Sequence, residues 1–380
     1  MKVLAALYQY HPYGGLQRDA YRLFEELARR GNQVNILTTK WQGEVPCPDL
    51  VHLELVSPPR FRSNHGRMAW FAKCFQKRLN DNVAGSFDVS IALNRIPGAD
   101  FYFAADVCMK SYWGKIHSAL ACRLIPRYRT YLALEQGIFS PCSQTKIACI
   151  VPAQIADYRL QYHTQKERFF LLPPGTDTNN KRPDELSSVR IRTEKRTAYH
   201  VSPNEIVVVM VGNSIYNKGI DRSIETIGNL PAKWKKKVRL WIIGGLPQKK
   251  LEMLLNQNQL TEQAEILGQI NGIRDYFLAA DLMLHPARNE AAGTVLIESI
   301  AVGTPVITTD ICGFSNYVSE SGNDVLVSPY SANTCLQTLI HALENLEPRK
   351  KKTLEYGVNA DFYSRAKVLA DAMENFIKDK

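Results

Sequence analysis

Short apolar runs alternate with amphipathic segments along the first half of the chain. Val3–Tyr8 is an apolar run, and after a loop the next apolar residues fall on one helical face, which Gly31 ends. That face consists of Leu16, Ala20, Leu23, Phe24 and Leu27. Two further strands are predicted at Val34–Leu37 and Val89–Leu93. The pattern is typical of buried parallel strands joined by helices that cover the sheet.

The same alternation restarts in the second half. The β-branched run Ile206–Val211 ends at Gly212, and a loop with Lys218-Gly219 leads into a predicted helix. Later strands are predicted at Leu240–Ile243, Leu282–Leu284 and Val306–Thr308. Two such series predict an α/β protein with two doubly wound Rossmann-like domains that face a central cleft. Ligands of such sheets bind at the carboxyl ends of the strands.

The length of 380 residues also favours two domains. The stretch from Pro173 to Arg196 is polar and rich in proline and charge, so we place the linker near its start. The expected domains are residues 1–170 and 171–355, with 356–380 as a final segment. No apolar run approaches the roughly 18 residues that span a bilayer. Because the apolar start Val3–Leu7 is too short for a signal peptide, we expect a cytoplasmic protein.

The cysteines indicate neither a disulfide framework nor a metal site. There are 8 of them, scattered along the chain with no C-x-x-C pair. Reduced thiols in a cytosolic protein are therefore the expected state. Since no His/Cys cluster has metal-ligand spacing, we expect no structural zinc.

Positive charge is concentrated in the first half. The net charge is +10, and residues 1–170 hold 22 basic and 13 acidic side chains, whereas residues 171–380 hold 25 and 24. An anionic partner of the first half is expected, which is a membrane surface, a phosphorylated substrate or nucleic acid. Nucleic acid is the weakest of these, because no helix-turn-helix, zinc-finger or RNP pattern is present.

Two acids, Glu290 and Glu298, flank a small-residue turn that opens a predicted helix. If the helix begins near Gly293, the backbone N–H groups of residues 293–295 point out of its end, where the dipole favours an anion. This arrangement suits a nucleotide sugar, with Glu290 on the sugar, the helix end on the diphosphate and Glu298 on the ribose. An ordinary helix with acidic residues in its first turns is the alternative. The residues between the two acids begin with Ala291, Ala292, Gly293, Thr294 and Val295.

Lys218 lies at a predicted helix start directly after a strand. A lysine there partly neutralises a diphosphate without a metal. The alternative is a surface lysine beside a helix cap.

Two candidates lie in the first half. The loop after the first strand holds Gly14 and Gly15, with Asp19 shortly after them, and adjacent glycines let the backbone approach a ligand closely. The pattern is not G-x-G-x-x-G, which disfavours a dinucleotide oxidoreductase, and a structural tight turn is the alternative. Asp106 follows the apolar run Phe101–Phe103, and half-buried acids near clefts can be functional. The alternative for Asp106 is a helix-capping aspartate.

Residues 107–134 contain no acid and form a basic surface segment. Its five bases are Lys110, Lys115, Arg123, Arg127 and Arg129. The apolar residues at helical spacing are Trp113, Ile116, Leu120 and Leu124. Such a pattern describes an interfacial helix on anionic lipid, which Pro126 should break into two pieces. A core helix with a basic solvated face is the alternative.

Together and in this order, the motifs resemble those of family 4 glycosyltransferases with the GT-B fold. The spacing from Glu290 to Glu298 and the strand before Lys218-Gly219 carry this likeness. A finer pattern, from the first strand to about residue 330, resembles the lipopolysaccharide core glucosyltransferase I family of Gram-negative bacteria. The segments that match are Tyr13–Asp19, Asn64–Arg67, Pro97-Gly98, Phe103–Cys108, Arg127–Arg129, Gln154–Asp157, Leu172–Gly175, Asp221–Ile224 and His285–Ala287.

The resemblance implies a retaining enzyme that moves glucose from UDP-glucose onto an inner-core heptose of a lipid-anchored acceptor. The reaction would take place at the cytoplasmic face of the bacterial inner membrane, without a metal or a further cofactor. The first domain would bind the acceptor and the second the donor, and the helix after about residue 355 would cross back onto the first domain. The attack would come from the face of the leaving group, whose diphosphate oxygen accepts the acceptor's proton.

The resemblance also implies roles for single residues. Glu290 would contact the donor sugar, residues 291–295 its phosphates, Glu298 the ribose and Lys218 the diphosphate. From the first domain, Gly14, Gly15 and Asp19 would reach the donor, and Asp106 would lie near the reacting hydroxyl. The catalytic residues would be Asp106, Lys218 and Glu290.

One position departs from the family. The family pairs Lys218 with an arginine, whereas this chain has Asn217 directly before the lysine and Asn213 soon after the strand. The missing cation would have to come from Lys181, Arg182 or Arg222. Two other functions stay open. One is a non-catalytic membrane-associated GT-B module that binds nucleotide sugars, and the other is a UDP-sugar 2-epimerase, which shares the fold.

Overall fold

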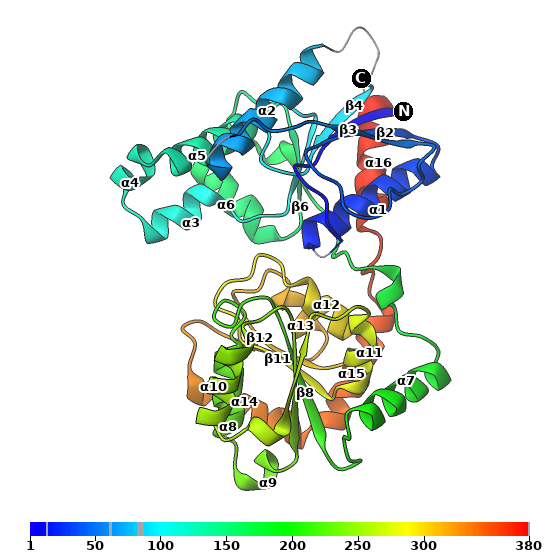
Figure 1. Ribbon diagram of the computed structural model, residues 1–380, viewed down its shortest axis with the longest axis vertical. Coiled ribbons are helices and arrows are strands. Elements are labelled where there is room, and N and C mark those ends of the chain that lie inside the picture. The colour runs from blue at the N-terminus through cyan, green and yellow to red at the C-terminus, as the bar shows by residue number, and fades with distance from the viewer. Residues whose placement is uncertain (13, 61–62, 82–86, 379–380) are drawn as a thin grey trace. The chain divides into compact units, whose positions relative to one another are not determined.

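The chain folds into two compact units. A computed structural model describes residues 1–12, 14–60, 63–81 and 87–378. The first unit consists of residues 1–175 and 364–380, and the second of residues 176–363. The first boundary expected from the sequence is 170/171, and the final segment is expected to start at residue 356. Each unit is a parallel sheet with helices on its faces, which confirms the predicted fold class (Figure 1).

The first unit is built on a seven-stranded parallel sheet in the order β3-β2-β1-β4-β5-β6-β7. Strand β1, third in this order, pairs Val3 with Val34 of β2 on one side and with Val89 of β4 on the other. These side chains are buried, which explains why the strands read as apolar runs. The strands are β1 (Lys2–Ala6), β2 (Gln33–Thr38), β3 (Val51–Leu55), β4 (Val89–Ala92), β5 (Phe101–Ala104), β6 (Lys146–Cys149) and β7 (Phe169–Leu171).

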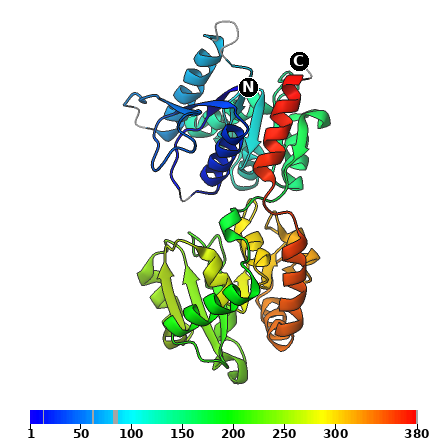
Figure 2. The same cartoon turned by 90° about the vertical axis from the view of Figure 1, so that its right-hand side faces the viewer.

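The helices of the first unit include one from the end of the chain. This helix, α16, lies beside α1 in both views (Figures 1 and 2). Arg30 at the end of α1 donates to Asp371 at 2.7 Å and to Glu374 at 3.0 Å, and Phe376 packs edge-on against Phe101. The helices are α1 (Gly15–Arg29), α2 (Asn64–Asn80), α3 (Met109–Ile116), α4 (Ala119–Leu124), α5 (Pro126–Phe139), α6 (Pro152–Tyr162), the short 3₁₀ helix η1 (Lys166–Arg168) and α16 (Arg365–Lys378).

The second unit is built on a six-stranded parallel sheet in the order β10-β9-β8-β11-β12-β13. The chain order reverses between β8 and β11, which are neighbours, and ligands of doubly wound sheets bind at such a switch point. The strands are β8 (Ile206–Val211), β9 (Val238–Ile243), β10 (Ala264–Gly268), β11 (Leu282–His285), β12 (Val306–Thr309) and β13 (Asp324–Leu326).

The helices of the second unit cover both faces of its sheet, and the core on one face packs Ile224, Leu251 and Leu339 against the strands. The helices are η2 (Thr178–Asn180), α7 (Glu185–Ala198), α8 (Ile220–Gly228), α9 (Ala232–Lys235), α10 (Gln248–Gln257), η3 (Thr261–Gln263), α11 (Ile273–Ala279), α12 (Thr294–Ala301), α13 (Ser315–Glu320), α14 (Ala332–Glu344) and α15 (Leu346–Asn359). Of the helices in the described parts of the chain, none is both long enough and apolar enough to cross a membrane.

Candidate functional site

The loops that follow β8 and β11 are tied together at the switch point of the second unit. The backbone N–H groups of Arg288 and Asn289 both donate to the carbonyl of Asn217, at 2.8 and 3.1 Å. Gly219 has a φ of 68°, and a Cβ atom there would lie 2.0 Å from the carbonyl oxygen of Pro286. Because any side chain at this position would collide with that carbonyl oxygen, only glycine fits directly after Lys218.

These contacts between the two loops bring Lys218 and Glu290 together. The Lys218 ammonium donates to Glu290 Oε2 at 2.5 Å, although the two residues are 72 positions apart. Their side chains are 20% and 13% exposed, so the pair is mostly buried yet open at its edge. Both residues are candidates from the sequence, and the structure joins them in one ion pair.

His285 is a third charged group of this cluster. It ends β11, is 1% exposed, and its Nε2 lies 3.5 Å from Glu290 Oε2. Burial lowers the pKa of His285, but the contacts with Cys312 and Glu290 outweigh burial and raise that pKa to about 9. Burial raises the pKa of Glu290, but His285 and Lys218 together hold it below its ordinary value. At neutral pH a glutamate therefore lies between two cations.

The helix that follows Glu290 begins where the sequence predicts. Gly293 caps α12 with a φ of 86°, and Thr294 is the first helical residue. The first amide N–H groups of a helix have no partner within it, so the beginning of α12 offers donors close to Glu290. The residues Ala291 and Ala292 form the small turn between the glutamate and the cap.

Glu298 lies inside the second unit rather than at an open surface. Its side chain is 3% exposed and accepts hydrogen bonds from Thr176 at 3.4 Å and Asn180 at 3.2 Å. Both donors belong to the segment that precedes α7. The carboxylate thus holds this segment against α12.

Two of the three cations suggested as substitutes for the family's arginine are engaged elsewhere. Arg222 lies over the ring of Tyr330 and donates to the carbonyl of Pro286 at 3.1 Å. Arg182 donates to the carbonyl of Val302 at 2.7 Å and pairs with Glu185. Lys181 is exposed. The expectation that Arg182 or Arg222 replaces the arginine is therefore not supported by their contacts.

Sequence reasoning missed Arg288, whose guanidinium braces the loop that carries Lys218. Its Nη1 donates to Asp221 at 2.7 Å and to the carbonyl of Tyr216 at 2.9 Å, and the group lies over the Tyr216 ring. The only sequence signal was its position after His285–Ala287, at the end of a strand.

In the first unit, the glycine loop opens α1. Gly14 is the N-cap and Gly15 the first helical residue, and around a Cβ atom built on Gly15 no other atom lies within 4 Å. Asp19, one turn further on, accepts from Arg365 of α16 at 2.9 Å and lies 3.5 Å from Arg22. Asp19 is thus held by the end of the chain. Tyr13, which the resemblance included, lies outside the described residues.

Asp106 follows β5, and its side chain is 60% exposed. Arg95 donates to its carboxylate at 3.0 Å. Its backbone carbonyl accepts from Gln154 at 3.0 Å and from Tyr158 at 3.3 Å. This carboxylate is therefore both open to solvent and fixed in place.

The basic surface segment forms three helices, α3, α4 and α5, which lie side by side (Figure 1). Pro126 begins α5 as predicted, but a further break separates α3 from α4. Arg123, Arg127 and Arg129 are exposed. The exposed apolar side chains beside them are Ile116, Leu120, Leu124 and Ile125.

Two members of this segment lie differently from the expectation. Trp113 was expected on the outward apolar face, but it is 6% exposed and its ring packs on Tyr128 at 4.6 Å, because the separate helices fold against each other. The ammonium of Lys110 points back to the carbonyl of Gln161 at 2.6 Å and lies over Tyr162. Lys115 lies in α3, but its side chain is outside the described residues.

Metal ligands do not gather in the described parts of either unit. Within those residues, no group of three or more His, Cys, Asp or Glu side chains has the arrangement of a metal site. In the second unit, Lys218, His285 and Glu290 are charged groups that meet next to the beginning of α12.

Comparison with known proteins identifies the family. The family described as "Glycosyl transferases group 1" matches residues 191–359. The lipopolysaccharide glucosyltransferase WaaG of Escherichia coli K12 is 34% identical over 377 residues, which cover 98% of both chains. The chain belongs to the group 1 glycosyl transferases. The enzyme class expected from the motifs is thereby confirmed.

Solved structures agree on the fold of this glycosyltransferase. The crystal structure of WaaG matches with a TM-score of 0.87 and 33% identity, over 98% of this chain and 99% of that one. Anabaena Alr3699/HepE, crystallised with UDP and glucose, matches over 100% of both chains with a TM-score of 0.74 and 14% identity. At that identity the second likeness shows the fold alone. The GT-B assignment is confirmed.

Proposed function

We propose that this glycosyltransferase moves glucose from UDP-glucose onto an inner-core heptose of lipopolysaccharide, with retention of the anomeric configuration. The observation that carries the proposal is the pair Lys218–Glu290 beside the beginning of α12, at the switch point of the sheet. The likeness to the Escherichia coli enzyme, whose name states a lipopolysaccharide glucosyltransferase, supports the choice of donor and acceptor class.

The donor would lie against the second unit. The diphosphate would accept from the first amide N–H groups of α12 at Gly293, Thr294 and Val295, and from the Lys218 ammonium. Glu290 would release Lys218 in part and accept from sugar hydroxyls, while protonated His285 keeps its carboxylate ionised. Glu298, whose carboxylate also accepts from Asn180, would accept from the hydroxyls of the ribose.

In the chemical step, the acceptor hydroxyl oxygen forms a bond to the anomeric carbon as the bond from that carbon to the β-phosphate oxygen breaks. Both events occur on the same face of the sugar, so the configuration is retained. The hydroxyl proton passes to the leaving phosphate oxygen. Lys218 and the helix amides stabilise the negative charge that builds on UDP. A single side-chain donor of this kind lowers the activation free energy by about 3–4 kcal/mol. No metal takes part in this proposal.

The first unit would bind the acceptor at an anionic membrane surface. Three exposed arginines, Arg123, Arg127 and Arg129, lie among exposed leucine and isoleucine side chains. Such a face suits the cytoplasmic leaflet of the inner membrane, where a lipid-anchored acceptor is presented. Asp106 would meet the reacting hydroxyl.

The test is a transfer assay with a heptose-bearing lipid acceptor and three donors, UDP-glucose, UDP-N-acetylglucosamine and UDP-galactose. We expect UDP release and an acceptor one hexose heavier with UDP-glucose, and unchanged rates in a chelator. Sugar interconversion without acceptor would instead indicate a UDP-sugar 2-epimerase. Donor binding without turnover would indicate a non-catalytic module.

A further inference from the structure

A line of three charged side chains crosses the first unit. It runs from the exposed Asp106 through Arg95 to Glu135, and the last two are 7% and 0% exposed. Arg95 follows β4, and Glu135 belongs to α5. The three residues come from separate parts of the chain, so their meeting is a product of the fold.

Arg95 donates hydrogen bonds to both Asp106 and the next residue, Val107. Its Nη1 donates to the Asp106 carboxylate at 3.0 Å, and its Nη2 donates to the carbonyl of Val107 at 2.6 Å. Its Nε donates to Glu135 Oε1 at 3.3 Å. Because a guanidinium is planar and its donors are fixed relative to one another, these bonds set the direction of the Asp106 carboxylate.

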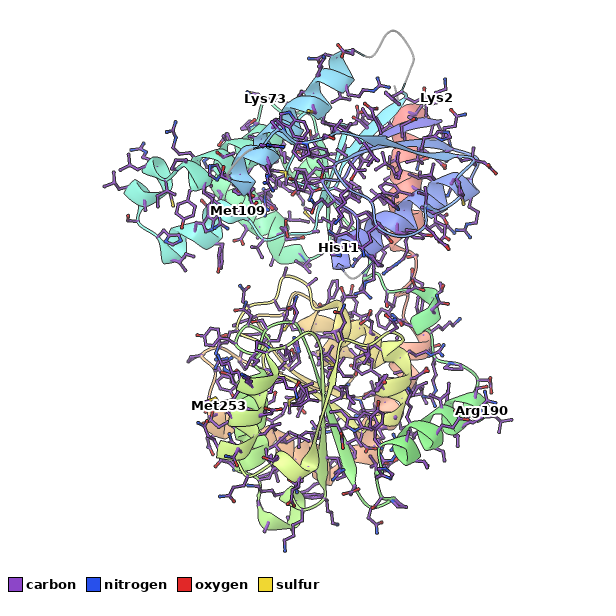
Figure 3. The ribbon with its side chains drawn as sticks, in the orientation of Figure 1. Lys2, His11, Lys73, Met109, Arg190 and Met253 are labelled. Atoms are coloured by element: carbon purple, nitrogen blue, oxygen red, sulfur yellow. The ribbon has the colours of Figure 1, made fainter. Side chains whose placement is uncertain are left out.

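Glu135 fixes Arg95 and also holds the beginning of α3. Its carboxylate accepts from the amides of Met109 at 2.9 Å and Lys110 at 3.1 Å, and from the Tyr162 hydroxyl at 2.6 Å. Met109, labelled in Figure 3, is the first residue of α3. A carboxylate at a helix N-terminus is favoured by the helix dipole. The direction of Asp106 is thus set together with the first turn of the basic surface segment.

The exposure of the three groups suggests which of them acts. The buried carboxylate of Glu135 accepts four hydrogen bonds from N–H and O–H donors, and the buried Arg95 donates three. Asp106 alone turns its carboxylate to solvent. An exposed aspartate normally samples several rotamers, so a buried pair that fixes one of them suits a group whose direction matters.

We propose that Arg95 and Glu135 are positioning residues that orient Asp106 toward the hydroxyl of the acceptor. This inference rests on the proposed function, in which Asp106 meets that hydroxyl. Neither positioning residue touches substrate. Each acts through the carboxylate of Asp106.

The experiment compares Arg95→Lys, Glu135→Gln and Asp106→Asn with the two double variants that contain Asp106→Asn. Arg168→Lys is the matched control, because Arg168 is equally buried and donates to the carbonyls of Thr145, Ser140 and Ile138 in the same unit. Melting temperatures verify folding, and the conservative replacements keep the buried site filled. A UDP-induced thermal shift verifies donor binding.

We expect Arg95→Lys and Glu135→Gln to lower kcat about 10- to 100-fold with the KM for UDP-glucose unchanged, since misplacement of a reacting group has an effect of that size. In the Asp106→Asn background, either change should cause no further loss. The inference is overturned if the losses multiply, if the single variants keep full kcat, or if Arg168→Lys loses as much.

A wild-type protein that transfers no hexose would contradict the proposed function, and the inference is then judged from crystal structures of the variants. The Asp106 carboxylate should change rotamer or lose its single conformation in Arg95→Lys and Glu135→Gln, and keep it in Arg168→Lys. An unmoved carboxylate in the first two variants would overturn the positioning role.

Discussion

The two units hold their candidate groups in different ways. In the second unit, Lys218, His285 and Glu290 converge at the ends of two neighbouring strands. In the first unit, Asp19 and Asp106 are each held by a separate arginine, and the basic surface segment is a third feature. In the proposed function, a compact diphosphate would need charges that meet at one point, whereas a lipid-anchored acceptor would need a wide surface with one directed group.

The largest expected effect is on the convergent cluster. Lys218→Ala should lower kcat about 10²- to 10³-fold, because the cation that stabilises charge on the leaving UDP is lost. The matched control is Lys249→Ala, an exposed lysine on α10 of the same unit. Transfer assays and melting curves measure the outcome, and a folded Lys218→Ala protein with full turnover would contradict the role of this lysine.

The next effect is on the stability of the second unit alone. Asp281, before β11, is 4% exposed and accepts from Arg192, Arg196 and Lys350, at 2.5, 2.9 and 2.7 Å. Asp281→Ala would leave these cations without their shared carboxylate and should destabilise the second unit by about 3–5 kcal/mol. Calorimetry should show the transition of the second unit move down while that of the first stays. A common shift of both transitions would contradict an effect of this carboxylate that is confined to the second unit.

The same carboxylate gives a pH dependence. Although burial raises the pKa of Asp281, Arg192 and Lys350 lower it to about 2. A depressed pKa contributes stability above the unfolded value of about 3.9 that is lost as the pH falls toward 2. The difference in stability between wild type and Asp281→Ala should therefore shrink between about pH 4 and 2. Denaturant titrations at several pH values measure it.

A smaller effect concerns the surface of the first unit. Replacing Arg123, Arg127 and Arg129 with glutamate should reduce partition onto anionic vesicles at least about 100-fold, at about 1 kcal/mol for each lost arginine. The control carries the same charge change on the second unit, at Arg190, Lys249 and Lys250, all exposed. Equal losses in the two triple variants would mean that net charge alone governs binding. Vesicle co-sedimentation at low and high salt distinguishes the cases.

The last effect concerns His285. Its pKa is raised to about 9, so its charged form contributes stability below about pH 6.5 that is lost as the pH rises through 9. His285→Gln should therefore lower the free energy of unfolding by roughly 3 kcal/mol at pH 6, and by much less at pH 10. Chemical denaturation at both pH values measures this. A constant difference would contradict a charged His285 beside Glu290.

Local sequence patterns were sufficient to select the candidate residues that lie at the ends of strands and helices. The strand before Lys218 and the glycine cap of α12 are local signals, so both ends of the Lys218–Glu290 pair could be chosen in advance. The pairing itself required the parallel order of β8 and β11. The predicted fold class followed from the same apolar runs.

Long-range charge networks and the breaks between short helices could not be predicted from the sequence. Arg95 and Glu135 are 40 residues apart, and neither lies in a pattern that distinguishes a buried charge from an exposed one. Trp113 was placed outward because a continuous helix was assumed. The break at His117 and Ser118 turns α3 so that this ring packs inward on α5.

The central claim is that a sugar nucleotide's diphosphate binds between Lys218 and the beginning of α12. A crystal structure of the protein soaked with UDP tests it most directly. We predict phosphate oxygens within hydrogen-bond distance of Lys218 Nζ and of the amides at Gly293 to Val295. Density for UDP at any other place, or a saturating soak that leaves these groups unoccupied, would contradict the account.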